Sequence, residues 1–210
     1  MDNLSIIRQI KNGEMTLSRN KHEYDKEVLI ASVVYNNDLY ALAYLNDKNV
    51  LSASEAKYIV KNNYNAFPII SKKLMNDEIF NFILKVRPAY FKNFPERYKK
   101  NKEWALKAIE RDYNAFNFIN ENLKYDKDVI LKTLDKNFFY MTKFSQDIFE
   151  DKEIRDKVLE KIEIKEFKEN FPKMYLLFES FNRKTELDEK INNLDINEDR
   201  NIFVKNKRKL

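Results

Sequence analysis

Apolar residues recur along this chain with helical spacing inside short blocks. Within a block they fall at positions i, i+4 and i+5, as at Trp104, Ala108 and Ile109, a spacing that places them on one face of an α-helix. A polar break containing Asn or Asp follows, and an aromatic residue then leads a second apolar stretch. The pattern predicts a helix of roughly two to three turns followed by a shorter one.

Two neighbouring blocks repeat one another. Residues 101–109 match residues 126–134, and residues 113–119 match residues 138–144, at an offset of 25 residues in both cases. The same interval leads back to Asn76 and forward to Asp151; the first clear copy begins at Asp25, and a slipped copy begins near Ser52. Tandem periods of this size are typical of repeat architectures.

Each block opens with a residue suited to begin a helix. Asp, Asn and Ser are preferred N-caps because a short side-chain oxygen accepts from the amides of the first turn. Acidic residues follow, where they meet the positive end of the helix dipole. Helices below roughly 12–15 residues are marginal alone, so the blocks must stack. We predict an all-α fold of tandem short helix pairs, with repeats of about 25 residues, stacked as an α-solenoid-like array. We expect no β-sheet and at least ten helices, most of them short.

The predicted organisation has three parts. Residues 1–23 form an N-terminal capping helix, with apolar residues from Leu4 to Ile10 and a candidate C-cap at Gly13. Residues 24–175 form the helical repeat array. Residues 176–210 continue an apolar stretch into a C-terminal capping helix and a charged tail, acidic first and then basic.

Composition narrows the class of protein. Apolar residues make up 43% and charged residues 35%, with one glycine and no cysteine, which favours a helical protein without disulfides or thiol chemistry. The first residues show no pattern of a signal peptide, and no apolar run is long enough to span a bilayer. We therefore expect a cytoplasmic protein. The formal net charge of +5 argues weakly for an acidic partner.

The repeat pattern resembles an uncharacterised bacterial family of short helical repeats, domain of unknown function (DUF) 4116. Residues 25–33 and 126–134 carry the similarity best, and it covers residues 24–160. The chain departs from the family in lacking a glycine at the break and in its many aromatic residues. The resemblance implies an α-solenoid-like fold and supplies no catalytic residue.

Candidate catalytic chemistry is sparse. His22 is the only histidine, so a metal site would depend on carboxylates, and a catalytic serine would have no other imidazole as its base. Carboxylates two residues apart do not face each other on a helix, and their position at block starts favours helix capping; they occur at Asp25/Glu27, Asp126/Asp128 and Asp151/Glu153. We expect no enzymatic activity, no cofactor and no metal.

A basic run inside the array is the first candidate binding segment. Lysine and arginine among aromatic residues can pair with phosphates and stack on bases, and Phe94 and Trp104 flank this run. The alternative, which we favour, is a solvated loop with Trp104 in the core, because Trp104 occupies a core position of its block. The candidate residues are Arg97, Lys99, Lys100 and Lys102.

Two further segments differ from repeat to repeat, which is where specificity for a partner should lie. One is the aromatic break of Phe138, Phe139 and Tyr140. The other is the basic C-terminus, for which a solubilising role is the simpler interpretation; its residues are Lys205, Lys207, Arg208 and Lys209.

These observations favour a non-enzymatic helical-repeat protein that binds another macromolecule, most readily a protein. Its size and lack of chemistry would suit a phage or bacterial inhibitor or immunity protein that docks on one enzyme. The alternative is an RNA- or DNA-binding protein that uses a basic face. The sequence predicts neither the identity of the partner nor an oligomeric state.

Overall fold

Helices are the regular secondary structure of the part of the chain that the structure describes. The structure, a computed structural model, describes the backbone of residues 2–207 and the side chains of residues 2–191. No β-strand occurs in this range, as predicted. The α-helices are α1 (Asn3–Lys11), α2 (Lys26–Asn36), α3 (Leu39–Asp47), α4 (Ala53–Asn62), α5 (Asp77–Val86), α6 (Glu96–Lys99), α7 (Lys102–Arg111), α8 (Lys127–Lys136), α9 (Lys152–Leu159), α10 (Ile164–Asn170) and α11 (Pro172–Lys207).

Short 3₁₀ helices lie between the α-helices, and the chain divides between Lys124 and Tyr125 into two compact units. This division falls inside the predicted array of residues 24–175. The 3₁₀ helices are η1 (Lys21–Glu23), η2 (Tyr64–Ala66), η3 (Lys72–Leu74), η4 (Pro88–Asn93), η5 (Tyr113–Phe118), η6 (Glu121–Tyr125), η7 (Phe138–Lys143) and η8 (Gln146–Glu150).

The first α-helix of each repeat begins at the predicted capping residue. The side chains of Asn76 and Asn101 accept from backbone amides of the first turns of α5 and α7, and Asp126 and Asp151 do the same for α8 and α9. Ser52 caps α4 in a reciprocal capping box with Glu55. Asp25 is the exception.

Asp25 precedes α2 without a side-chain capping bond. Its carboxylate instead accepts a hydrogen bond of 2.6 Å from the Asn3 amide. The first helix of the chain is thereby tied to the start of the first clear repeat. Gly13, the predicted C-cap, follows α1 with a φ of 75°, a conformation in which glycine carries no Cβ penalty.

The second half of a typical repeat is built from 3₁₀ turns rather than from one α-helix. The polar-break residue caps it: Asn63, Asp112 and Asn137 each accept from the amide two residues ahead, at the starts of η2, η5 and η7. The predicted pairing of two α-helices holds at α2 and α3, where Asp38 accepts from the Ala41 amide. Elsewhere the helix after the break has six residues or fewer, and so short a helix suits i→i+3 hydrogen bonds.

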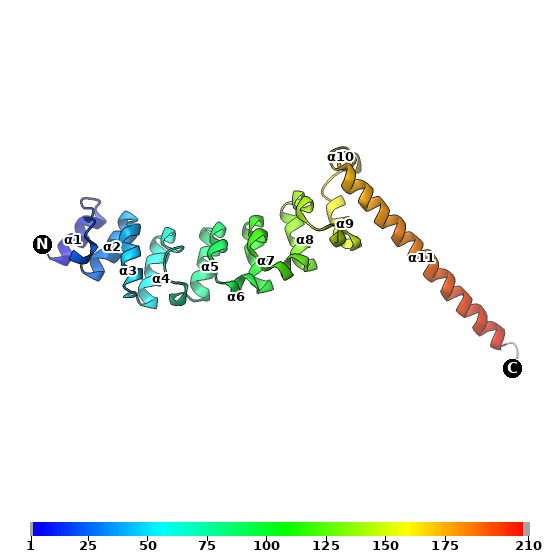
Figure 1. The fold of residues 1–210 in the computed structure, drawn as a ribbon, viewed down its shortest axis with the longest axis horizontal. Coiled ribbons are helices and arrows are strands. Elements are labelled where there is room, and N and C mark those ends of the chain that lie inside the picture. Colours follow the sequence, from blue (N-terminus) through cyan, green and yellow to red (C-terminus); the bar gives the residue numbers. More distant parts are fainter. Residues whose placement is uncertain (1, 208–210) are drawn as a thin grey trace. The chain divides into compact units, whose positions relative to one another are not determined.

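The first unit, residues 1–124, packs the α-helices of successive repeats against each other. α2 contacts α4, α4 contacts α5, and α5 contacts α7, and in Figure 1 these helices follow one another in chain order. Aromatic rings fill the space between α5 and α7: Phe94 lies 4.7 Å from Phe80, and Tyr98 lies 4.7 Å from Trp104. Ile109 is fully buried, as its place in the repeat predicts.

The second unit, residues 125–210, has its own apolar core. Leu134, Phe149 and Phe167 are buried there, and Phe178 from the first part of α11 packs against Phe149 at 5.1 Å. Phe178 belongs to the predicted C-terminal segment of residues 176–210, and the helix that carries it, α11, already begins at Pro172. The core joins α8, α9, α10, η8 and the beginning of α11.

A buried arginine also belongs to this second core. Arg155 is 1% exposed and occupies the repeat position that Ile130 fills in the preceding repeat. Its guanidinium donates to the carbonyl oxygens of Phe149 (2.6 Å) and Glu150 (2.9 Å), and to the Asn182 side chain (3.0 Å). Arg155 thus links η8 to α11.

Candidate functional site

The predicted basic run forms a short helix rather than a loop, and its charges do not make one free surface. Arg97 is exposed and lies over the Tyr98 ring at 4.8 Å. Lys99 is half-buried and pairs with Glu96 at 3.2 Å. Lys100 is exposed at the end of α6, whereas Lys102 is half-buried at the start of α7.

The aromatic residues beside this run are in the core. Trp104 is 8% exposed, and Phe94 is buried with it. The Phe94 ring contacts those of Phe80, Tyr98 and Trp104, and the Trp104 ring contacts those of Phe94 and Tyr98. Because both rings are buried, neither is accessible for stacking on a base. The prediction that Trp104 lies in the core is confirmed.

The three residues of the aromatic break, residues 138–140, differ in how far their side chains are exposed. Phe139 is 56% exposed, Phe138 is half-buried, and Tyr140 is 4% exposed with Lys143 over its ring at 4.6 Å. Only Phe139 of these candidates presents a substantial apolar surface to solvent. Its ring also lies 6.1 Å from that of Phe171.

The basic C-terminus cannot be described in the same way. Lys205 and Lys207 belong to the last turns of α11, but their side chains lie outside the described ones. Arg208 and Lys209 lie outside the described residues altogether.

The remaining candidate groups do not assemble into a metal or nucleophile site. His22 is exposed on η1. Among the side chains of residues 2–191, no group of three or more His, Asp and Glu residues could hold a metal ion. The paired carboxylates at the starts of α8 and α9 contribute Asp126 and Asp151, which cap those helices.

First-turn acidic residues have a second role that sequence analysis missed. They pair with lysines of the preceding repeat: Glu55 with Lys26 at 2.7 Å, Glu78 with Lys57 at 2.6 Å, and Glu153 with Lys127 at 2.7 Å. A lysine directly after the capping residue, as in Lys26 and Lys127, is the sequence signal for this pairing.

These pairs change the pKa values of their members. The hydrogen bond from Lys26, followed by that from the Ser52 amide, lowers the pKa of Glu55 to about 2. Hydrogen bonds from Lys57 and Lys61 lower the pKa of Glu78 to about 2. The groups are largely exposed, so each pair contributes little to stability.

Lys72 is a further cation, and it contacts an aromatic ring and backbone carbonyl oxygens. Its ammonium lies 4.4 Å from the centre of the Phe67 ring and donates to the carbonyl oxygens of Pro68 (3.3 Å) and Ile70 (2.9 Å). Burial lowers the pKa of Lys72 to about 8. The contacts fix the turn after η2, which is a structural role.

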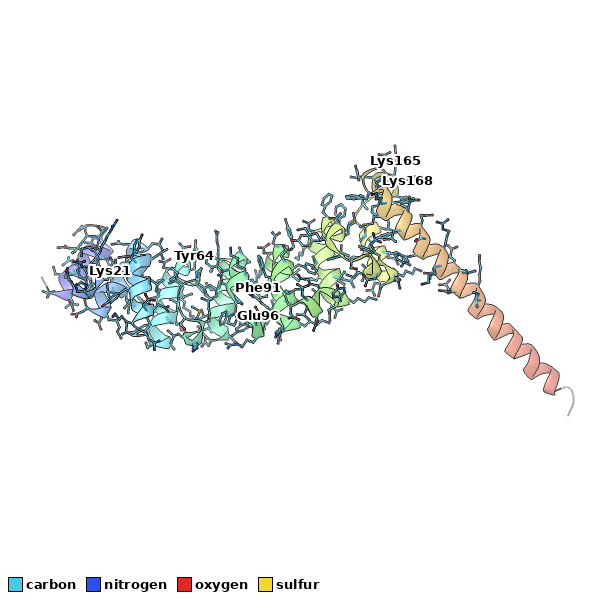
Figure 2. All side chains as sticks on the ribbon, viewed as in Figure 1. Lys21, Tyr64, Phe91, Glu96, Lys165 and Lys168 are labelled. Carbon is cyan, nitrogen blue, oxygen red and sulfur yellow. The ribbon has the colours of Figure 1, made fainter. Side chains whose placement is uncertain are left out.

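Exposed apolar residues recur directly after the polar break. Leu39 and Tyr40 follow Asp38, Tyr64 follows Asn63, and in the second unit Phe139 follows Asn137 after one residue. Tyr40 is 83% exposed and Tyr64 is 40% exposed; Figure 2 labels Tyr64 in the first unit. We call Leu39, Tyr40, Tyr64 and Phe139 the post-break residues. An alignment of the residues after each break would have found them.

The first unit contains a pocket of about 390 Å³ beside its first repeat. The extended segment before η1 forms one wall, the end of α2 another, and the start of α3 the third. Side chains that define its chemistry are Leu17, Arg19, Lys21, Ser32, Asp38 and Tyr40.

A buried ion pair forms the floor of this pocket. Lys21, labelled in Figure 2, is 7% exposed, and its ammonium lies 2.6 Å from the Asp38 carboxylate. The same carboxylate accepts from the Ser32 hydroxyl at 3.0 Å and from the Ala41 amide at 3.0 Å. Burial acts to raise the pKa of Asp38, but the hydrogen bonds from Lys21, Ala41 and Ser32 outweigh it, so that pKa lies below its usual value.

Sequence analysis did not identify Lys21, Arg19 or Asp38 as site residues. Asp38 occupies the polar-break position, which is also an aspartate at Asp112 and an asparagine at Asn63 and Asn137. A carboxylate there is therefore no signal by itself, and its partner Lys21 belongs to an irregular segment that the repeat does not describe.

Neither a family model, nor a curated protein, nor a solved structure matches this chain. The resemblance to domain of unknown function (DUF) 4116 therefore stays a prediction. Within the described residues, every helix is too short or too polar to cross a bilayer.

Proposed function

We propose that this is a non-enzymatic helical-repeat protein whose repeats stack as an α-solenoid-like array and which binds another protein. The post-break residues carry this proposal. Single exposed apolar side chains are common on protein surfaces. Here they recur at the same one or two positions of several repeats, and repeat proteins bind partners through such equivalent exposed positions.

Packing between successive repeats supports the array. In the first unit the Asn63 amide donates to the Val33 carbonyl (2.8 Å) and to the Asn37 side chain (2.9 Å) of the preceding repeat. Lys26 and Glu55 join the starts of the α2 and α4 helices in the same way. Repeats that share such contacts with their neighbours place equivalent side chains in rows.

The kind of partner follows from which groups are exposed. Tyrosine and phenylalanine are enriched at protein interfaces, whereas stacking on nucleic-acid bases would need accessible rings among the basic residues. Trp104 and Phe94 beside the basic run are buried, which favours a protein over a nucleic acid. The net charge of +5 favours an acidic protein through steering of the encounter. A target enzyme in the cytoplasm, inhibited on docking, is the specific form of this proposal.

The test is affinity capture from host lysate with matched variants. The test variant carries Tyr40→Ser, Tyr64→Ser and Phe139→Ser, and the control carries Leu4→Ser and Leu176→Ser, which are equally exposed but lie outside the post-break positions. Exposed substitutions usually change stability by only about ±0.5 kcal/mol, so both variants should fold. We expect a protein that wild type and control retain and the test variant loses.

Two results would contradict the proposal. A captured protein retained equally by the test variant would exclude the post-break residues as its binding surface. Retention that disappears with nuclease treatment and weakens steeply with salt would show a nucleic-acid interaction instead. If a protein is captured specifically, adding the purified chain to it should lower its enzymatic activity.

A further inference from the structure

The pocket in the first unit has walls that are held in place before any ligand binds. The Asn36 amide donates to the Met15 carbonyl at 2.9 Å, and the Ser18 amide donates to the Tyr24 hydroxyl at 3.3 Å. Met15, Leu17 and Tyr24 also pack on the small core formed by Ile10, Val28 and Ala31. The segment is therefore anchored by both polar and apolar contacts.

The pocket exists because the first repeat is incomplete. After α1 the chain turns at Gly13 and runs through Met15–Asn20 without a helix until η1. Later repeats fill this stage with a 3₁₀ helix that buries an aromatic ring, such as Phe91 of η4 or Phe116 of η5. The missing helix leaves a hollow, and its size lies in the range of about 300–1,000 Å³ typical of small-molecule sites.

The charges of the pocket favour an anion. Both oxygens of Asp38 accept hydrogen bonds, because Lys21 and Ser32 donate to one and the Ala41 amide donates to the other. Lys21 uses one of three ammonium donors in that pair. In the described part of the chain, no side chain pairs with the exposed guanidinium of Arg19. With two cations and one anion in the lining, the pocket carries one uncompensated positive charge.

The apolar part of the lining favours a flat group beside that anion. Leu17 is half-buried on the wall, and the Tyr40 ring is exposed at the mouth. Aromatic side chains bind planar groups by stacking or edge-to-face contact. Ligand pockets typically combine such apolar walls with a few oriented polar groups.

We propose that this pocket binds a small organic anion, a carboxylate or a phosphate monoester attached to an aromatic ring. The anionic group lies against Arg19 and the free donors of Lys21, and the ring lies against Leu17 and Tyr40. This site is independent of the proposed protein-binding surface, apart from the shared residue Tyr40.

The proposal is tested on the purified full chain by ligand-observed NMR titration. Benzoate and phenyl phosphate are the probes, and their relative affinities show which anion the pocket prefers. Benzyl alcohol and benzylamine are the uncharged and cationic controls. We expect saturable binding of at least one anion at millimolar concentration or below, and at least tenfold weaker binding of both controls.

Matched variants locate the binding. Arg19→Gln should weaken anion binding at least tenfold, and Tyr40→Ser should weaken it less because it removes only a ring contact. Arg97→Gln on α6, which removes an equally exposed arginine elsewhere in the same unit, should leave it unchanged. Circular dichroism confirms that each variant is folded.

Three outcomes would overturn the proposal. The first is that neither anion reaches saturation at millimolar concentration. The second is that benzyl alcohol binds as tightly as benzoate. The third is that the Arg19→Gln variant binds the anion as tightly as wild type does. None of these bears on capture of a protein partner, since Arg19 is not a post-break residue.

Discussion

Lys21 in the first unit and Arg155 in the second are both buried cations, but their partners differ. Lys21 is neutralised by the Asp38 carboxylate, and its side chain lines a pocket. Arg155 binds two backbone carbonyl oxygens and an amide side chain, and its guanidinium lies 5.7 Å from the Phe181 ring. No carboxylate within the described side chains pairs with it.

The difference shows two ways of ending a row of repeats. Arg155 stands at the repeat position that Ile130 fills with an apolar side chain. It does so in the last repeat, after which α11 follows, and its hydrogen bonds join α11 to η8. Lys21 stands where a repeat is incomplete, and the ion pair leaves space unfilled. A buried charge that binds backbone fixes structure, whereas one that faces a hollow remains able to bind a ligand.

The largest expected effect tests whether the two units have separate cores. Ile109→Asp in the first unit and Leu134→Asp in the second each place an unpaired carboxylate in a fully apolar environment, at a cost of several kcal/mol. Each variant should lose the ordered structure of its own unit. Hydrogen exchange measured by mass spectrometry would show this loss of structure. If either variant lost no more unfolding free energy than a capping variant such as Asp126→Ala, the core assignment would be wrong.

The next effect concerns the C-terminal cation. Arg155→Ala removes a buried side chain and leaves the Phe149 and Glu150 carbonyls without their donor, so we expect a loss of about 3–5 kcal/mol. Arg155→Met keeps much of the volume and removes the charge, and should cost less. Chemical denaturation measures both. Equal stability of wild type and the alanine variant would exclude a role for Arg155 in holding α11.

At the N-terminal end, breaking the ion pair should cost more than removing it. Asp38→Ala leaves the Lys21 charge buried without a partner, at about 3–5 kcal/mol. The double variant Lys21→Met, Asp38→Leu replaces both charges by apolar groups and should recover part of that loss. Chemical denaturation measures both variants. If the double variant were less stable than Asp38→Ala, the pair would stabilise the fold by more than the neutralisation of its two charges, which would contradict this prediction.

The same pair predicts a pH dependence. Because the pKa of Asp38 is lowered in the folded protein, its stabilisation is complete above the unfolded-state pKa of about 3.9 and is lost as the pH falls through the folded value. Asp38→Asn should therefore show a smaller decrease in unfolding free energy below about pH 4 than wild type. Parallel pH profiles for the two proteins would contradict this assignment.

The smallest effect compares two capping positions. Asp126→Ala should cost about 1 kcal/mol, because its carboxylate accepts from the Asp128 and Val129 amides. Asp25→Ala should cost less, since Asp25 makes no capping bond and only accepts from Asn3 at an exposed site. Thermal denaturation of the matched pair distinguishes them, and a larger loss for Asp25→Ala would reverse the assignment.

Local chemistry explains which features the sequence could predict. Capping by Asn76 or Asp151 depends on a side chain and the next three residues, and the burial of Ile109 and Leu134 depends on helical spacing, so both were predictable. The 3₁₀ geometry of η5 and η7 was not, because the apolar pattern alone does not distinguish i→i+3 from i→i+4 hydrogen bonds over six residues.

The buried charges lay beyond the same approach. Arginine is a residue type that usually lies at the surface. The burial of Arg155 is explained by its hydrogen bonds to the carbonyl oxygens of η8 and to the side chain of Asn182. Of the predicted binding residues, Tyr140 is buried because consecutive positions of a tight helix face different directions. Whether Arg97 and Phe139 bind a partner stays a prediction.

The contacts between repeats also set an order in time. The Asn63 bond to Val33 spans 30 residues, the Lys57 bond to Glu78 spans 21, and the Arg155 bond to Asn182 spans 27. Chains with such short-range contacts fold fast, and the amino-terminal part folds first during synthesis. Each repeat can therefore fold against the preceding one as it leaves the ribosome. Arg155 has to wait for α11, so the second unit is completed only when Asn182 has emerged.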